Sequence, residues 1–106
     1  MTTRGSEAWR NVPPIPRSQS QQLAASRRSL GEFLTERFKN AFAREVEEVM
    51  FETFPDGLYA TLYVSGARST AHNVWAVSMS SALDDAGVEV HVVVRPASDR
   101  LEAVAR

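Results

Sequence analysis

The sequence contains no cysteine among its 106 residues. Disulfide bonds, thiolate zinc sites and cysteine nucleophiles are therefore excluded. Long apolar runs are also missing: residues 1–10 hold no stretch of about seven apolar residues, as a signal peptide would, and no segment approaches the roughly 18 of a membrane span. We expect a cytoplasmic protein without a membrane span.

Catalytic and ligand-binding motifs are missing as well. The sequence has no phosphate-loop pattern and no Gly-x-Ser-x-Gly elbow. Its two histidines, His72 and His91, could be combined with Glu89 or with Asp84 and Asp85, but a metal site needs three or four converging ligands. We therefore expect no metal, no cofactor and no enzymatic activity.

The composition is that of a folded protein, with 43% apolar and 24% charged residues. The net charge of −1 hides an uneven distribution. Residues 1–29 carry five arginines and one glutamate, a net charge of +4, whereas residues 30–106 carry seven basic and twelve acidic residues, a net charge of −5. This division predicts a basic, flexible arm over residues 1–29 and one compact domain over residues 30–106.

The arm is rich in proline, serine and glutamine. Pro13, Pro14 and Pro16 favour a polyproline II conformation, and the spacing Pro13-x-x-Pro16 followed by Arg17 is similar to that of ligands of aromatic-lined grooves. Residues 18–26 fit either a linker or the frayed start of the next helix. The arm could bind an anionic or protein partner, or serve only as a solubilising tail.

Helical spacing dominates residues 30–54, where apolar residues recur in steps of three and four. Ser29 is the expected N-cap, with Glu32 completing a capping box, and Pro55-Asp56-Gly57 is the expected stop. The residues of the predicted apolar face are Phe33, Leu34, Phe38, Ala41, Phe42, Val46, Val49, Met50 and Phe54.

Two segments alternate as half-buried strands do. In residues 58–65, Tyr59 and Tyr63 fall on the polar face, and residues 88–95 place four valines on one face and His91 on the other. Residues 99–106 are expected to form a short helical tail.

The segment 69–86 fits two structures. As a helix it begins at Ser69 or Thr70 and ends at Gly87; as a strand it alternates over residues 73–80. We expect the helix, because a helical close followed by a valine-rich strand is typical of an α-to-β unit. The predicted fold is α+β, in the order α-β-α-β-α, with the long first helix on a small sheet and a right-handed parallel crossover. The alternative is one helix on a three-stranded antiparallel meander.

The turn after the first predicted strand is a candidate anion-binding site. A glycine turn that leads into a helix N-terminus directs free amides at an anion. A plain helix cap explains the same residues. The candidates are Gly66, Arg68, Ser69 and Thr70.

We expect a non-catalytic assembly or adaptor subunit that self-associates or joins a larger complex while its basic arm contacts a neighbour. The alternative is a small nucleic-acid-associated regulatory protein whose arm binds phosphates. The five arginines of the arm are not interleaved with several aromatic residues, and the body is acidic, which fits the first role better. The expected partner contacts are Pro13, Pro16, Arg17, Arg27, Arg28, Tyr59 and Tyr63.

Overall fold

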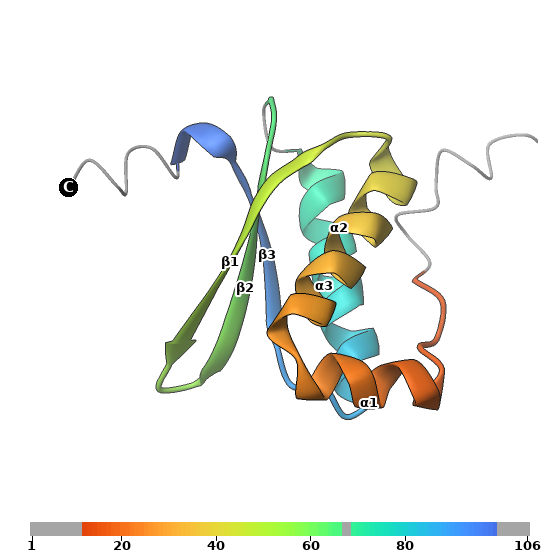
Figure 1. Ribbon diagram of the computed structural model, residues 1–106. Helices are drawn as coiled ribbons and strands as arrows, with labels where there is room; N and C mark the ends of the chain where they lie inside the picture. Colours follow the sequence, from red (N-terminus) through yellow and green to blue (C-terminus); the bar gives the residue numbers. More distant parts are fainter. Residues whose placement is uncertain (1–11, 67–68, 100–106) are drawn as a thin grey trace, which may run out of the picture.

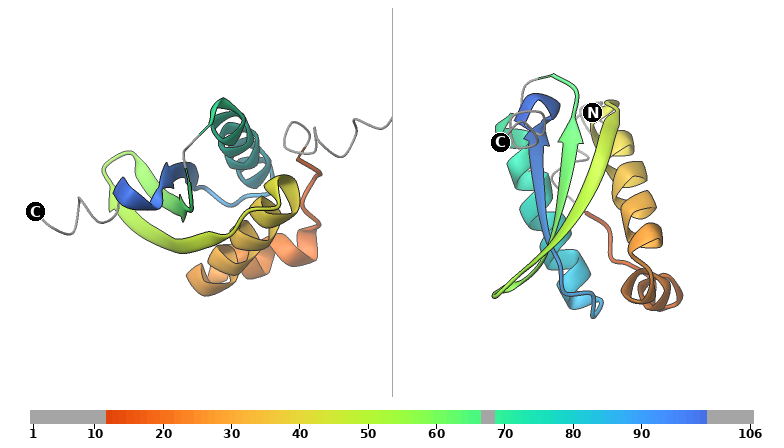
Figure 2. Two further views of the ribbon diagram at one scale, coloured as in Figure 1. Left: turned by 90° about the horizontal axis from the view of Figure 1, so that it is seen from above. Right: turned by 60° about the vertical axis from the view of Figure 1, so that its left-hand side comes forward.

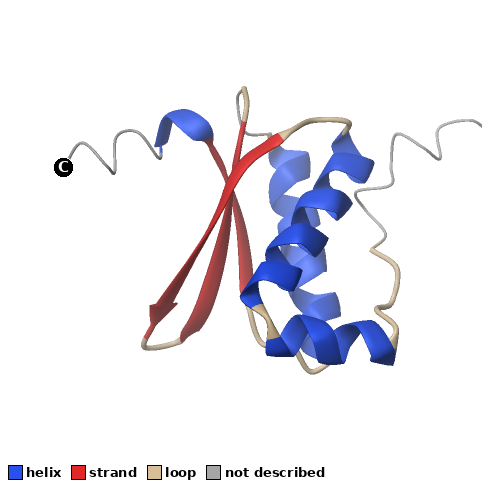
Figure 3. Cartoon of the chain, in the orientation of Figure 1, coloured by secondary structure: helices blue, strands red, loops and turns tan. Residues whose placement is uncertain are grey.

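A three-stranded sheet and a layer of helices make up the computed structural model, which describes residues 12–66 and 69–99 (Figure 1). The α+β class that the sequence predicts is confirmed, but the described part of the chain starts with two helices, which a hairpin follows (Figure 3). The helices are α1 (Arg17–Ala25), α2 (Arg27–Phe42) and α3 (Thr70–Asp85), and the strands are β1 (Val46–Phe54), β2 (Gly57–Val64) and β3 (His91–Pro96). Residues 97–99 are helical, and the rest of the predicted tail lies outside the described residues.

The sheet has the order β1-β2-β3. Strands β1 and β2 form an antiparallel hairpin, which turns at Pro55 and Asp56, and Gly57 there adopts a φ of 135° that suits glycine. Strand β3 pairs parallel to β2 after the connection through α3. The helix over residues 69–86 and the parallel pairing are therefore confirmed, and the antiparallel meander is wrong.

The predicted helix over residues 30–54 is wrong in its second half. Helix α2 ends at Phe42, and Ala43 takes the left-handed conformation, with φ at 53°. The chain then forms strand β1, so that the sheet has three strands instead of the two that the sequence predicts. A register shift between Val46 and Glu48 marks a β-bulge, which interrupts the alternation of side chains that would identify a strand.

Part of the segment assigned to the arm is helical. Residues 17–25 form α1, and the next helix begins at Arg27, with Ser26 as its N-cap instead of Ser29. The Ser29 N–H donates to Ser26 Oγ at 3.1 Å. The side chain of Leu23 is only 4% exposed and joins the core, so this segment buries an apolar group that the sequence pattern does not reveal.

The core lies between α2, α3 and the sheet. Phe38 and Trp75 meet edge to face with centroids 5.3 Å apart, and both are buried. His72 is 3% exposed, and its ring contacts those of Phe38 and Phe42. Within the described part of the chain, no helix is long and apolar enough to cross a membrane.

Candidate functional site: the open face of the sheet

Helices α2 and α3 cover one face of the sheet (Figure 2). On the opposite face, the described part of the chain places only the short helical segment of residues 97–99, at one end of the sheet. We call this second face the open face. The strand registers place side chains across it in three rows. These rows are Glu48, Tyr63 and Arg95; Met50, Thr61 and Val93; and Glu52, Tyr59 and His91.

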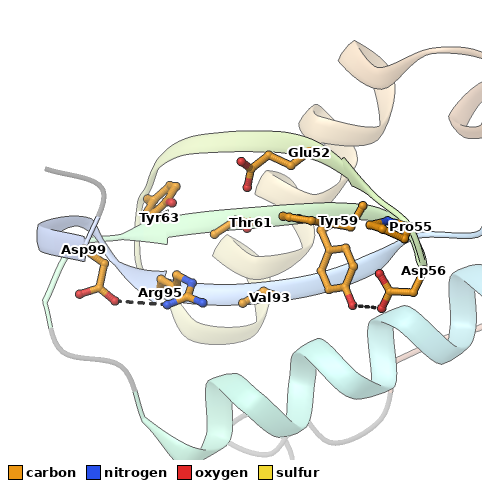
Figure 4. A pocket seen from close by; sticks show the side chains of 10 residues that line it. Glu52, Pro55, Asp56, Tyr59, Thr61, Tyr63, Val93, Arg95 and Asp99 are labelled. Atoms are coloured by element: carbon orange, nitrogen blue, oxygen red, sulfur yellow. Dashed lines mark hydrogen bonds and ion pairs between the residues drawn. The ribbon is translucent and has the colours of Figure 1, made fainter. Parts of the chain in front are cut away.

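The open face contains a hollow of about 540 Å³ (Figure 4). Both polar and apolar side chains line it, and they come from all three strands, the hairpin turn and the segment after β3. The lining residues are Glu52, Phe54, Pro55, Asp56, Tyr59, Thr61, Tyr63, Val93, Arg95 and Asp99.

Three rings meet near the hairpin end of the open face. The ring of Tyr59 stacks on His91, with centroids 4.6 Å apart and planes inclined by 27°. Phe54 approaches Tyr59 edge to face at 5.1 Å and remains 45% exposed. This aromatic cluster presents apolar surface beside charged groups, a combination typical of protein contact surfaces.

The phenol of Tyr59 is fixed by the hairpin turn. Its hydroxyl donates to Asp56 Oδ2 at 2.6 Å. This hydrogen bond stabilises the charged carboxylate, and it is the main reason why the pKa of Asp56 is lowered. The same bond raises the pKa of Tyr59, because ionisation of the phenol would remove the donated proton. At neutral pH the pair is a neutral phenol and a carboxylate.

Negative charge predominates around the hollow. Arg95 Nη1 lies 3.7 Å from Asp99 Oδ2, in a partly exposed ion pair. Asp56 and Glu52 add two further carboxylates. The lining residues therefore include three acidic side chains and one arginine. A cationic partner fits this face better than an anionic one.

The two edges of the sheet differ. On β3, the Val92 N–H donates to Ser80 Oγ of α3 at 2.8 Å, and Pro96 has no N–H to offer. Ser80 Oγ in turn donates to the Ala76 carbonyl at 2.8 Å. Strand β1 has nine residues and no proline, and within residues 12–66 and 69–99 its only partner strand is β2. The edge of β3 is therefore partly closed by its own chain, in the manner of protected edge strands.

The candidate anion site lies at the start of α3. Ser69 is the N-cap, and its N–H donates to Nδ1 of the buried His72 at 3.3 Å. Gly66 is exposed and takes a φ of 79°, while Arg68 lies outside the described residues. A different arginine lies next to this turn: Arg44 Nη1 donates to the Ser65 carbonyl at 3.3 Å. An anion site here remains a prediction.

The expected partner contacts are divided between two sides of the molecule. Tyr59 and Tyr63 share the open face, although Tyr63 is largely buried. Pro13 lines a groove with Trp75 and Met79 on the helical side. The remaining expected contacts precede or begin helices: Pro16 and Arg17 at α1, and Arg27 and Arg28 at α2.

Sequence reasoning missed the carboxylates and the phenylalanine of the open face. The sequence predicts a helix that includes Glu52 and Phe54, and a plain turn at Asp56. Glu52 and Phe54 join the alternation that identifies Tyr59 and Tyr63 only if β1 is recognised as a strand, whereas Asp56 lies in the turn between the strands.

Metal ligands do not gather within residues 12–66 and 69–99: no group of three or more His, Asp or Glu side chains there could hold an ion. The fold and the open face together define a small α+β protein with an acidic, partly aromatic sheet surface. Comparisons with protein families, curated proteins and solved structures find no match for the chain.

Proposed function

We propose that this protein is a non-catalytic assembly or adaptor subunit that binds a protein partner on the open face of its sheet. The hollow of about 540 Å³ on that face, lined by Phe54 and Tyr59 of the aromatic cluster, is the observation that supports this function. An exposed aromatic patch with a polar rim is typical of protein contact surfaces.

The aromatic cluster is held in place before any partner arrives. The 2.6 Å hydrogen bond to Asp56 and the stacked His91 both restrict the ring of Tyr59. A side chain already held in one position loses little conformational entropy on binding. Tyrosine is also enriched among the residues that contribute most to binding at protein interfaces.

Nucleic-acid binding through the arm is the second candidate. Arg27 and Arg28 are adjacent and exposed at the start of α2, and Arg17 is exposed at the start of α1. The acidic open face disfavours phosphates, however, and Arg28 Nε lies 3.8 Å from Glu32 Oε2. Protein assembly therefore has the stronger support.

A matched pair of substitutions tests the proposed function. Phe54 and Val77 are exposed apolar residues, 45% and 71% exposed, on the open face and on α3 respectively. We expect Phe54→Ser to release the partner, because it removes a ring of the aromatic cluster, and Val77→Ser to retain it. The full chain and both variants would be purified from the native source, and the mass of each complex and its components determined.

Two outcomes contradict the proposal. One is a wild-type chain that sediments as a monomer at micromolar concentration and carries no other protein. The other is a partner that Val77→Ser releases and Phe54→Ser retains. Nucleic acid that co-purifies in place of protein would favour the second candidate.

A further inference from the structure

Strand β1 lies at one edge of the sheet, and every second residue of an edge strand directs its N–H and C=O away from the neighbouring strand. The nine residues of β1 include no proline that would interrupt such a row. On β3, by contrast, Ser80 already accepts from the Val92 N–H, and Pro96 ends the strand. Of the two edges, β1 is the better template for an added strand.

The side chains of β1 define what an added strand must carry. On the open face, a new strand would lie beside Glu48 and Glu52, and β1 contains a third glutamate, Glu47, but no lysine or arginine. Opposite charges across neighbouring strands stabilise a sheet, and like charges destabilise it. The positions of the new strand beside these glutamates therefore favour lysine or arginine.

On the other face, β1 presents apolar side chains. Val49 and Phe51 are half-buried against the core and line a groove of about 470 Å³ between β1 and α2. The α2 side of this groove consists of Gly31, Thr35 and the charged residues Arg27, Arg28, Glu32 and Glu36. A new strand would place every second side chain over this groove. Apolar side chains there would cover Val49 and Phe51.

A second copy of this chain does not meet these requirements. Two β1 strands would bring three glutamates from each copy into one pair of strands, and antiparallel pairing centred on Met50 would set Glu48 opposite Glu52. The negative charge of β1 therefore disfavours pairing with a second β1 strand and favours pairing with a different strand that carries basic residues.

We infer that the β1 edge binds an extended segment of a partner protein in which basic and apolar residues alternate, added to the sheet as a fourth strand. The apolar residues cover Val49 and Phe51, and the basic residues lie beside Glu48 and Glu52. This inference rests on the proposed function, since it names the partner's chemistry and its manner of attachment.

Two peptides of about nine residues, the length of β1, test the inference on the full chain. One alternates valine with lysine and the other valine with glutamate, and both have blocked ends. We expect only the lysine peptide to bind and to slow hydrogen exchange at the amides of β1 and not of β3, as followed by NMR. Glu52→Gln should weaken its binding about two- to five-fold, the effect of one cross-strand charge pair.

Glu89→Gln is the matched control, because Glu89 is an exposed glutamate outside β1, and this variant should bind as the wild type does. A second control uses two analogues of the lysine peptide, N-methylated on the valines or on the lysines. One analogue should lose binding and the other retain it, because only one set of amides faces β1.

Equal binding of the lysine and glutamate peptides, protection of β3 in place of β1, or no binding at about 1 mM peptide, the weak end of measurable affinity, would each overturn the inference. These results leave the proposed function standing if Phe54→Ser still releases a protein partner. If Phe54→Ser retains every partner, the proposed function fails instead.

Discussion

At the residue scale, Tyr59 connects most of the open face. Its hydroxyl donates to Asp56, its ring stacks on His91, and Phe54 meets it edge to face. These three contacts come from β1, the hairpin turn and β3. A single substitution at Tyr59 therefore affects every part of the aromatic cluster.

Removing the hydroxyl of Tyr59 tests the hydrogen bond to Asp56. The pKa of Asp56 is lowered chiefly by this bond, so we expect Tyr59→Phe to raise it toward the ordinary aspartate value. A carboxyl whose pKa is depressed in the folded state adds stability above its unfolded pKa, and this stability is lost as the pH falls through the folded pKa. The variant should therefore lose less stability than the wild type between about pH 5 and pH 2.

NMR titration of the side-chain carboxyl of Asp56 gives the first measurement, and thermal unfolding at several acid pH values gives the second. Tyr63→Phe is the control, since Tyr63 lies on the same face but makes no hydrogen bond to Asp56. An unchanged Asp56 pKa in Tyr59→Phe would show that the 2.6 Å bond does not determine it.

At the element scale, local pattern predicts β2 and α3 because each carries its own signal. Strict alternation identifies β2, and the start of α3 at Ser69 and its end before Gly87 are signalled by residues that favour those positions. Strand β1 lacks such signals. Ala43 ends α2 without glycine or proline, and the bulge near Val46 makes the apolar spacing of β1 resemble a continued helix.

The residues of the open face can be predicted from the sequence only where the strand that carries them can be predicted. Tyr59 and Tyr63 follow from the alternation of β2, whereas Glu52 and Phe54 depend on the pairing of β1 with β2. Burial differs from the expectation as well: Thr61 and Tyr63 lie on the face of β2 that the sequence predicts to be polar, yet both side chains are buried in this central strand. Pairing between strands is a tertiary property that overrides local propensity.

The contact between α3 and β3 can be tested through Ser80. Ser80→Ala removes the acceptor of the Val92 N–H, and Val92 is buried, so its amide would lose a partner in an apolar setting. We expect the free energy of unfolding to fall by about 1–3 kcal/mol. Urea titration of the full chain measures it.

Ser81→Ala provides the comparison, because Ser81 is the exposed neighbour of Ser80 on the same helix. Its effect should stay within about 0.5 kcal/mol. If the two variants proved equally stable, the Ser80 hydroxyl would not be a significant partner of the β3 edge.

At the scale of the whole molecule, the charge distribution and the hydrophobic core place the boundary between the arm and the folded domain at different residues. The change from basic to acidic sequence falls near residue 29, but the core already includes Leu23 of α1, and Val12 and Ile15 pack against it. Charge alone thus places the start of the folded part too late. Buried apolar side chains determine at which residue the folded domain starts, because their burial supplies most of the favourable free energy of folding.

This difference predicts that α1 belongs to the cooperative unit of folding. Leu23 is 4% exposed within the core, and replacing a buried leucine by alanine removes apolar contacts and leaves a cavity. We expect Leu23→Ala to lower the free energy of unfolding by about 2–5 kcal/mol. A chain that lacks residues 1–25 should lose at least as much, because Val12 and Ile15 are removed together with Leu23.

Thermal and urea unfolding of both chains, followed by circular dichroism, decides whether α1 is part of that unit. Gln22→Ala is the matched control, since Gln22 is the exposed neighbour of Leu23 on the same helix and its replacement should change stability by no more than about 0.5 kcal/mol. If the truncated chain unfolded at the same urea concentration as the full chain, α1 would be an appendage, and the folded domain would begin at α2, close to the boundary that the charge distribution indicates.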